Sequence, residues 1–463
     1  MSKIMLPLFF LTITIISVLF MAYITYLSLQ SMPSFLIVIF FFTAILVLLN
    51  YLFKKIKKRY LRKIIKISSL VLTVLILFIT FSTFKTISFI KNLSGETEYI
   101  KTYYVVALKE NNYQLEDITK ITVYENSDSS KVIEQLKRVI SFETITSFDL
   151  GEIVDQLTNN QIQAILIEKN IHDLLIEEIE TFDQKTIILY QVELTSKIEV
   201  MPITVDPTEK PFNVLITGID SYGDIKRVGR SDVNVVINVN PKTRKIVIIS
   251  IPRDYYVNIH GEDKLKDKLA HSGIYGTEKT IKTVENLLDI EINYYLKVNF
   301  NSIIELVEAI GIITVNSEYH FESGGYRFYK GENQMDGYKA LAFLRHRYTL
   351  PGGDRGRNLN HQIFINGVIE KATTPAVLMR YNTILHKLEN KIIFNMEEEK
   401  IIAFIKKELN SKEKWQIVNY GLNGFDASDY TYTSSKSKRY VMIPDQETVE
   451  EAKELIIKNK GKD

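Results

Sequence analysis

Three apolar segments in the middle of the chain decide its fold: FNVLITGID at residues 212–220, RSDVNVVINV at residues 230–239 and KIVIISIPRD at residues 245–254. Their near-continuous runs of Val, Ile and Leu are typical of strands that are buried on both faces of a sheet. NPKT at residues 240–243 is a turn signal. The second and third segments are therefore predicted to form an antiparallel hairpin.

The segments that follow supply helices for both faces of such a sheet. Residues 277–288 and 302–310 have apolar side chains at helical spacing, and they flank a strand predicted at residues 294–298. Further helices are predicted at residues 358–371, 376–388, 397–409 and 446–458, and further strands at residues 312–315 and 440–443. The predicted fold class is α/β, an α/β/α sandwich with a mixed central sheet.

Arginine and aspartate side chains stand where these predicted elements end. They are Asp220, Arg230, Asp232, Arg253, Arg345, Arg347, Asp354, Arg355 and Arg357. Ligands of α/β sheets bind at strand ends, and converging guanidinium groups match the oxygens of a phosphate. Internal ion pairs with Asp254 and Asp354 are the alternative. The pattern predicts a phosphate site, whereas the absence of a Walker A loop gives nucleotide binding no support.

Two of the aspartates are candidate metal ligands. Asp220 follows the first strand and Asp232 opens the second, so one edge of the sheet could present both carboxylates. Two hard oxygen ligands with open positions suit Mg²⁺, which also binds substrate phosphate and water. The alternative is that Asp220 is a turn residue and Asp232 a local cap. Zinc is not expected, because the chain has no cysteine and no His pair at helical spacing.

The first ninety residues contain no Asp or Glu. Apolar runs at residues 4–29, 35–53 and 67–84 predict three transmembrane helices. The basic segment at residues 54–66 would be a cytoplasmic loop, which leaves the large C-terminal portion extracytoplasmic in a multi-pass protein of the cell membrane. A cleaved signal peptide is the alternative for the first run. The lack of cysteine fits a Gram-positive type of surface. The net charge is +2, but outside the basic segment the chain is balanced to slightly acidic, which argues against nucleic-acid binding.

Three regions are predicted along the chain. Residues 1–92 form the membrane region, residues 93–207 a small α/β accessory domain, and residues 208–463 the catalytic domain. The accessory domain has strand-like runs at residues 103–108, 164–167 and 186–190, helical runs at residues 129–139 and 151–157, and no catalytic constellation. Two prolines within residues 201–207 predict an extended linker.

Three sequence blocks carry a resemblance to a known family. RSD at residues 230–232, SIPRD at residues 250–254 and FLRHR at residues 343–347, with Asp354 and Arg357 behind them, resemble the signature of the LytR–CpsA–Psr family. The resemblance covers residues 211–371, and the preceding regions look like those of the CpsA-type branch, which has an accessory domain before the catalytic one. It implies an Mg²⁺-dependent phosphotransferase that moves a glycopolymer from a polyprenyl-pyrophosphate carrier onto peptidoglycan.

The resemblance also implies roles for individual residues. Asp220 and Asp232 would be metal ligands, and Arg230, Arg253 and Asp232 would be catalytic. The pyrophosphate would be bound by Arg230, Arg253, Arg345, Arg347, Asp354, Arg357 and Gln362. The family usually continues with Arg-x-x-Arg-Gln, but residues 357–362 read RNLNHQ. The second arginine is absent, so Arg357 and Gln362 fit the pattern only with an offset, and His361 or Arg355 could supply the missing contact.

The predicted reaction is attack of a peptidoglycan hydroxyl on the sugar-proximal phosphorus of the lipid-linked polymer, in cell-wall or capsule assembly. A non-enzymatic lipid-phosphate sensor and a polyprenyl pyrophosphatase are the alternatives. Expected partners are the polyprenyl-pyrophosphate-linked glycan, peptidoglycan, membrane lipid, and capsule polymerase or regulatory kinase components. The sequence leaves open which glycopolymer is transferred and which group is the general base.

Overall fold

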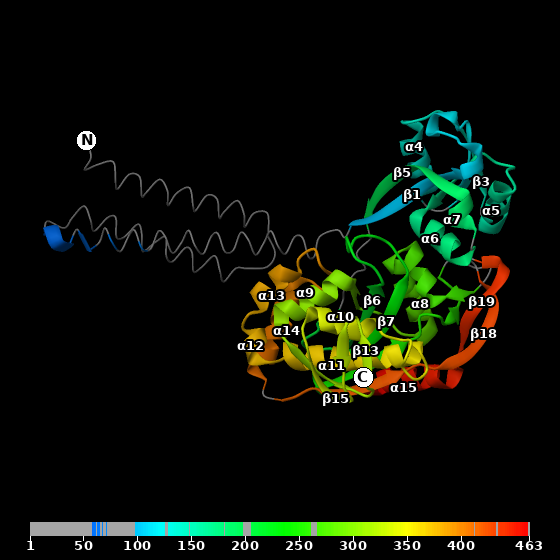
Figure 1. The fold of residues 1–463 in the computed structure, drawn as a ribbon. Coiled ribbons are helices and arrows are strands. Elements are labelled where there is room, and N and C mark those ends of the chain that lie inside the picture. The colour runs from blue at the N-terminus through cyan, green and yellow to red at the C-terminus, as the bar shows by residue number, and fades with distance from the viewer. Residues whose placement is uncertain are drawn as a thin grey trace. The chain divides into compact units, whose positions relative to one another are not determined.

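In the computed structural model, the described residues are 98–125, 128–147, 149–179, 181–197, 205–260, 266–411, 413–431 and 434–461, with a few positions between 58 and 71. Two separate sheets organise the residues from 98 onward (Figure 1). The first sheet uses only residues up to Lys197, and the second begins at Phe212.

The membrane part of the predicted fold class requires a correction. Among the described residues, no helix is long and apolar enough to cross a lipid bilayer, so the prediction of three transmembrane helices is not supported. The three runs on which it depended, at residues 4–29, 35–53 and 67–84, fall almost wholly outside the described residues.

The second sheet is mixed, as predicted. Its strands follow the order β16-β11-β6-β7-β8-β17. They are β6 Phe212–Ile219, β7 Ser231–Asn240, β8 Lys245–Ile251, β11 Tyr294–Val298, β16 Ile393–Phe394 and β17 Gln416–Gly421. The β7–β8 hairpin is antiparallel, as the turn signal indicated, whereas β6 with β11 and β8 with β17 pair in parallel. The ends of β6, β8 and β11 and the start of β7 consequently lie at one edge of the sheet.

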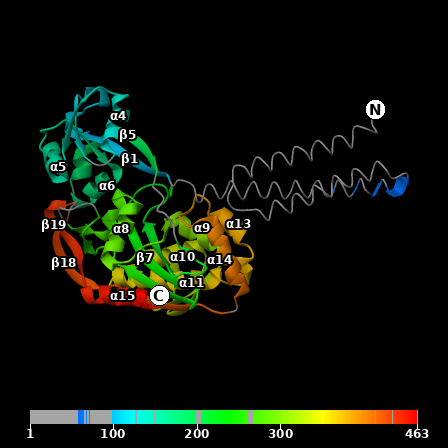
Figure 2. The ribbon, with the colours of Figure 1, turned by 180° about the vertical axis from the view of Figure 1, so that it is seen from behind.

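Helices cover both faces of this sheet (Figures 1 and 2). On one face are α9 Phe300–Ile310, α10 Gly337–Arg345, α11 Asp354–Ala372, α12 Pro375–Leu378, α13 Tyr381–Leu388 and α14 Glu398–Asn410. On the other are the 3-10 helix η3 Leu269–Tyr275, α8 Thr277–Leu288 and α15 Gln446–Lys460. The α/β/α sandwich predicted from the strand pattern is thus the arrangement observed.

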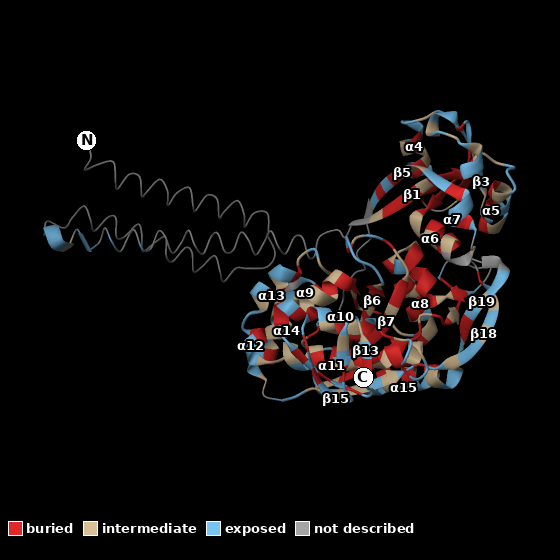
Figure 3. Ribbon diagram, in the orientation of Figure 1, coloured by how far each residue is buried: buried red, intermediate tan, exposed pale blue. Residues whose placement is uncertain are grey.

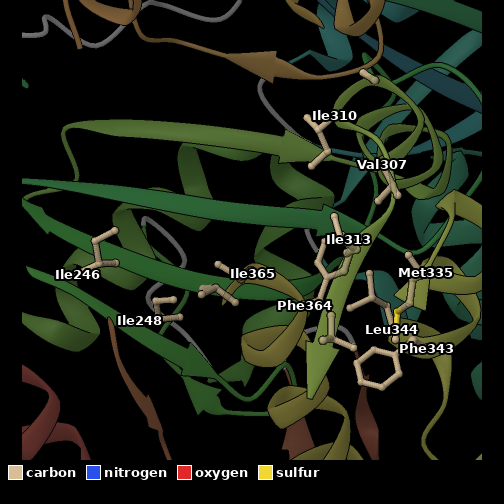
Figure 4. Packing of buried hydrophobic residues seen from close by; sticks show 14 of the residues in the cluster. Ile246, Ile248, Val307, Ile310, Ile313, Met335, Phe343, Leu344, Phe364 and Ile365 are labelled. Atoms are coloured by element: carbon tan, nitrogen blue, oxygen red, sulfur yellow. The ribbon is translucent and has the colours of Figure 1, made fainter. Parts of the chain in front are cut away.

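The core of the first face joins sheet and helices directly. Ile246 and Ile248 of β8 belong to the same buried cluster as Val307 of α9, Phe343 of α10 and Phe364 of α11 (Figure 4). Gly218, at the end of β6, allows close strand contact, because a Cβ there would lie 2.8 Å from the Cβ of Val233. These contacts fix the strand ends relative to α10 and α11.

Sequence reasoning missed several short strands around the sandwich. They are β9 Tyr256–Val257, β10 Asp267–Lys268, β13 Phe321–Ser323, β14 Tyr326–Phe328, β15 Gly331–Met335, β18 Gly424–Thr431 and most of β19 Ser434–Pro444. The strand predicted at residues 312–315 is observed as β12 Ile313–Ser317. These strands pair as β9 with β10, β12 with β15, β13 with β14 and β18 with β19.

The first sheet has the order β3-β2-β4-β1-β5. Its strands are β1 Glu98–Leu108, β2 Lys120–Tyr124, β3 Glu143–Ser147, β4 Ala164–Glu168 and β5 Thr186–Lys197. The helices around it are η1 Lys109–Asn111, η2 Leu115–Asp117, α4 Ser129–Lys137, α5 Leu150–Thr158, α6 Lys169–Glu178 and α7 Phe182–Lys185. Buried residues of β1 and β4 belong to two core clusters, one on each face of the sheet, and Figure 3 shows buried positions in red along β1. We call residues 98–197 the β1–β5 module.

Candidate active site

A cavity of about 560 Å³ opens at the edge of the second sheet where β6, β8 and β11 end. Its charged lining is Asp220, Arg230, Asp232, Arg253, Arg345, Arg347 and Arg357. Its apolar lining includes Ile216, Ile237, Leu296, Val298, Ile303, Leu306, Leu341, Phe364, Ile365, Val368 and Ile369. One cavity therefore joins a cluster of arginines and aspartates to an apolar interior between the sheet and α9, α10 and α11.

Asp232 is the central buried acid of the cluster. It is only 4% exposed, and its Oδ1 accepts a hydrogen bond of 2.7 Å from Nη1 of Arg253. Its Oδ2 is 3.9 Å from Nε of Arg230. The carboxylate of Asp232 thus pairs with two arginines, Arg230 just before β7 and Arg253 just after β8.

Asp354 stands behind the cluster and ties three arginines together without lining the cavity. Its carboxylate is 3.4 Å from Nε of Arg253, 3.5 Å from Nη2 of Arg357 and 4.0 Å from Nη1 of Arg347. Burial opposes ionisation of Asp354, but Arg357 and Arg253 outweigh it and lower its pKa. Asp354, predicted to bind the pyrophosphate, therefore contacts three arginines of the cluster and does not line the cavity itself.

The arginines keep binding capacity in spite of these ion pairs. Burial alone would lower the pKa of Arg253, but Asp232, Asp254 and Asp354 together raise it. The Nε atoms of Arg253 and Arg357 are buried without a hydrogen-bond acceptor among the described residues. Arg253 and Arg357 nevertheless line the cavity together with Arg230, Arg345 and Arg347, and guanidinium groups bind anions through charge-assisted hydrogen bonds, so the cavity suits an anionic ligand.

At the end of α10, the first and third of three consecutive residues, Arg345 to Arg347, face the cavity. Arg345 and Arg347 both line it, and Cζ of Arg345 lies 4.4 Å from the ring centre of Phe300. His346, between them, does not line the cavity: its ring stacks on Phe321 at 4.6 Å and its Nε2 lies 2.6 Å from Oγ1 of Thr349. His346 therefore anchors the turn that aims the two arginines.

The sequence left open which of Arg355, His361 and Gln362 contacts the ligand, and their positions on α11 distinguish them. His361 lines the cavity beside Arg357, and burial and that arginine lower its pKa to about 3, so its ring is neutral at neutral pH. Gln362 does not line it and donates instead to the Tyr420 carbonyl oxygen at 2.8 Å. Arg355 is also outside, where it donates to the carbonyl oxygen of Gly424 at 2.7 Å. Of the three, only His361 is placed to face a ligand in the cavity.

Some lining residues were missed by sequence reasoning. Asn299 and Phe300 line the cavity just after β11, and Tyr348 lines it beside Arg347. The rule that ligands bind at strand ends could have indicated Asn299 and Phe300, because they follow the strand predicted at residues 294–298. No comparable signal marked Tyr348.

The residues present fit a magnesium ion. Asp220, which is exposed, and Asp232, which is buried, line the same cavity and offer hard oxygen donors. Mg²⁺ is usually held by one or two carboxylates together with substrate phosphate and water, so two aspartates suffice. Among the described residues there is no group of three or more His, Cys, Asp or Glu arranged to hold a metal.

Comparison with known proteins identifies the family. The model of the LytR_cpsA_psr family matches residues 179–455. The protein named polyisoprenyl-teichoic acid–peptidoglycan teichoic acid transferase TagU from Bacillus licheniformis is 39% identical over 187 residues, which are 40% of this chain and 60% of the relative. TagU from Bacillus cereus strain AH820 is 34% identical over 234 residues, covering 50% of this chain and 76% of the relative.

A solved structure is also similar. The crystal structure of B. subtilis TagV is 27% identical, covers 54% of this chain and 98% of its own, and has a TM-score of 0.47. The family match covers more than half of the chain and includes every residue that lines the cavity. The chain belongs to the LytR_cpsA_psr family.

Proposed function

We propose that the protein is a glycopolymer transferase of cell-wall assembly, which moves a polymer from a polyprenyl-pyrophosphate carrier onto peptidoglycan. The observation that carries this proposal is the single cavity with a charged rim and an apolar interior. A lipid-linked glycan has the matching order of parts, an apolar chain followed by a pyrophosphate. The names of the TagU relatives, which describe transfer of teichoic acid to peptidoglycan, support the same reaction class.

The charged rim suits the pyrophosphate. Arg230, Arg253, Arg345, Arg347 and Arg357 supply five guanidinium groups at the strand and helix ends. Each charge-assisted hydrogen bond to a phosphate contributes about 1.5–3 kcal/mol. Several such bonds can hold a diphosphate and stabilise the charge that develops when it is cleaved.

The apolar interior suits the beginning of the polyprenyl chain. Ile303 and Leu306 of α9 face it from one side, and Phe364, Val368 and Ile369 of α11 from the other. Burial of hydrocarbon there contributes roughly 25 cal/mol per Å². Lipid binding positions the phosphates at the rim, and that positioning is the main requirement of phosphoryl transfer.

The reaction follows from this placement. A hydroxyl oxygen of a peptidoglycan sugar attacks the sugar-proximal phosphorus, and a new P–O bond forms. The bond from that phosphorus to the bridging oxygen breaks, and polyprenyl phosphate leaves with the bridging oxygen. The hydroxyl proton passes to water. Arg230 and Arg253, held against Asp232, stabilise the negative charge on the departing and equatorial oxygens.

We further propose that Asp220 and Asp232 hold Mg²⁺ at the rim, where the ion would neutralise part of the pyrophosphate charge. Asp354 would keep Arg253, Arg347 and Arg357 aimed at the same phosphates. His361 is neutral beside Arg357 and adds no charge to the site, and its Nε2 lies 3.3 Å from the Leu344 carbonyl oxygen.

The cargo and the location follow from the same chemistry. The relatives' names favour a teichoic-acid type of polymer, with capsule polysaccharide as the alternative cargo. Because the acceptor is peptidoglycan, the reaction belongs on the extracytoplasmic side of the cell membrane. A contact with a capsule polymerase or a regulatory kinase stays a prediction.

The test is turnover by the purified 463-residue protein. It would be supplied with a polyprenyl-pyrophosphoryl glycan and a peptidoglycan oligomer, with and without Mg²⁺, and compared with Arg345→Ala. Arg327→Ala, at an exposed arginine paired with Glu322, is the matched control. We expect Mg²⁺-dependent release of polyprenyl phosphate together with glycan attachment, reduced about 10- to 100-fold by Arg345→Ala alone.

Other outcomes distinguish the alternatives. Release of polyprenyl phosphate with water as the acceptor, and no attachment to peptidoglycan, would identify a pyrophosphatase. Lipid binding without any turnover would contradict the transferase proposal and support a sensor.

A further inference from the structure

The loop between β6 and β7, residues 220–230, carries a candidate site residue at each end. Asp220 begins it and Arg230 ends it, and both line the cavity. A loop that holds catalytic groups must be fixed, because misplacement by about 1 Å can reduce the rate by about two orders of magnitude. One part of this β6–β7 loop is held by β11 and α9, since the Phe300 N–H donates to the Ser221 carbonyl oxygen and Nδ2 of Asn299 to that of Gly223. Two further sets of contacts connect the loop to the β1–β5 module.

The first set of contacts comes from the β1–β5 module. The Ile100 N–H donates to the Lys226 carbonyl oxygen at 3.0 Å, and the Val228 N–H donates to the Ile100 carbonyl oxygen at 3.4 Å. The loop thus adds a short parallel bridge to β1 between Ile100 and Arg227.

The side chain of Arg227 extends this bridge across two strands of the module. Its Nη1 donates to Oγ1 of Thr102 on β1 at 3.2 Å, and its Nη2 lies 3.4 Å from Oε1 of Glu193 on β5. The Arg227 carbonyl oxygen, on the opposite side, accepts a 2.7 Å hydrogen bond from Nζ of Lys297 on β11. Arg227 therefore joins both sheets through one residue.

The second set of contacts passes through η3. Ile274 is fully buried in a core cluster of the module, among Leu108, Ile153 and Ile167. Its neighbour Gly273 lies against the end of the β6–β7 loop, so closely that a Cβ there would be 2.5 Å from the Gly229 carbonyl oxygen. The position of η3 therefore links the core of the module to the backbone next to Arg230.

We infer that the β1–β5 module positions the β6–β7 loop of the active site, and that it acts through two positioning residues outside the module, Arg227 of the loop and Ile274 of η3. The expected effect on the rate depends on the proposed function, whereas the expected effect on hydrogen exchange in the loop does not. Neither side chain lines the cavity, so each acts on Asp220 and Arg230 only through the backbone of the loop. The apolar lining comes from β6, β7, β11, α9, α10 and α11 and not from the loop, so loosening the loop should lower kcat and leave KM for the lipid substrate nearly unchanged.

The test compares Arg227→Ala, Arg227→Lys and Ile274→Ala in the 463-residue protein. Arg138→Ala is the matched control, because Arg138 lies in the same module and pairs with Glu134 at its surface without contacting the loop. We expect Arg227→Ala to lower kcat about three- to tenfold, with partial recovery in Arg227→Lys, which keeps the charge. Amide hydrogen exchange in residues 221–230 should be faster in Arg227→Ala and Ile274→Ala than in the control, since the Val228 amide is protected by Ile100.

The outcomes separate this inference from the proposed function. Faster exchange with reduced kcat supports both. Exchange in residues 221–230 that is unchanged in Arg227→Ala and Ile274→Ala overturns the positioning role, whatever the activity. If the unsubstituted protein shows no turnover, the proposed function fails, and the exchange measurements still decide whether the module holds the loop.

Discussion

Replacing Asp232 by Asn tests the centre of the site, because it removes one charge and almost no volume. The carboxylate is 2.7 Å from Nη1 of Arg253 and 3.9 Å from Nε of Arg230. At an effective dielectric constant of about 20, unit charges about 4 Å apart interact by about 4 kcal/mol, and part of that attraction offsets the cost of desolvation. The buried charge-assisted bond becomes a bond to a neutral amide, so we expect Asp232→Asn to lower the free energy of unfolding by about 2–3 kcal/mol.

The same loss should appear in the rate. If misplacement of Arg230 and Arg253 reduces the stabilisation of the transition state by about 2–3 kcal/mol, turnover falls about 30- to 160-fold. Measured without Mg²⁺, KM for the pyrophosphate substrate should not rise, because the variant site has one negative charge fewer. Stimulation by Mg²⁺ should also weaken if Asp232 is a ligand.

The assay is release of polyprenyl phosphate by Asp232→Asn, alongside urea denaturation. Glu322→Gln is the matched control, since Glu322 also lies 2.7 Å from an arginine but both partners are exposed. We expect this control to keep wild-type turnover. Turnover of Asp232→Asn within twofold of wild type would refute the reasoning, because it would show that the ion pairs of Asp232 with Arg230 and Arg253 do not affect the reaction.

Three further predictions concern buried groups near the site. Lys297 is 4% exposed, and burial lowers its pKa to about 8. The free energy of unfolding of the wild type should therefore rise by about 3 kcal/mol, relative to that of Lys297→Met, between about pH 8 and pH 10.5. Urea denaturation would contradict this if the difference between the two proteins did not change with pH. Because the pKa of His361 is lowered to about 3, the free energy of unfolding should fall by up to about 1.4 kcal/mol per pH unit as the pH falls below 6.5. In acid denaturation curves, His361→Gln should remove this dependence, whereas the control His386→Gln, at an exposed histidine, should keep it. Gly273→Ala places a Cβ 2.6 Å from the Ser231 amide nitrogen and should cost about 1–3 kcal/mol and reduce turnover, whereas unchanged kcat would show that this contact does not position the loop.

The candidate site shows where local sequence patterns are informative. Apolar runs predicted the strands, and the residues that follow those runs, Asp220 and Arg253, do lie at one edge of one cavity. By contrast, Gln362 fits the family pattern in sequence, yet its side chain turns to the Tyr420 carbonyl oxygen. On a helix, one position further along turns a side chain by about 100°, so motif spacing alone does not decide which side chain faces the ligand.

By itself, the sequence determined the mixed α/β/α sandwich, the arginine and aspartate residues at its strand ends, and the membership of the family. These features depend on local periodicity and on residue types at fixed spacing, which are present in the chain before it folds. Its prediction of transmembrane helices was not supported among the described residues.

Only the tertiary structure decided that the charged and apolar linings share one cavity, and that Asp354 holds three arginines from behind it. It also decided that Arg227 joins the β6–β7 loop to Thr102, 125 residues earlier. Such contacts depend on how separate sheets and helices pack, and no periodic pattern within one segment records which distant segment it will meet.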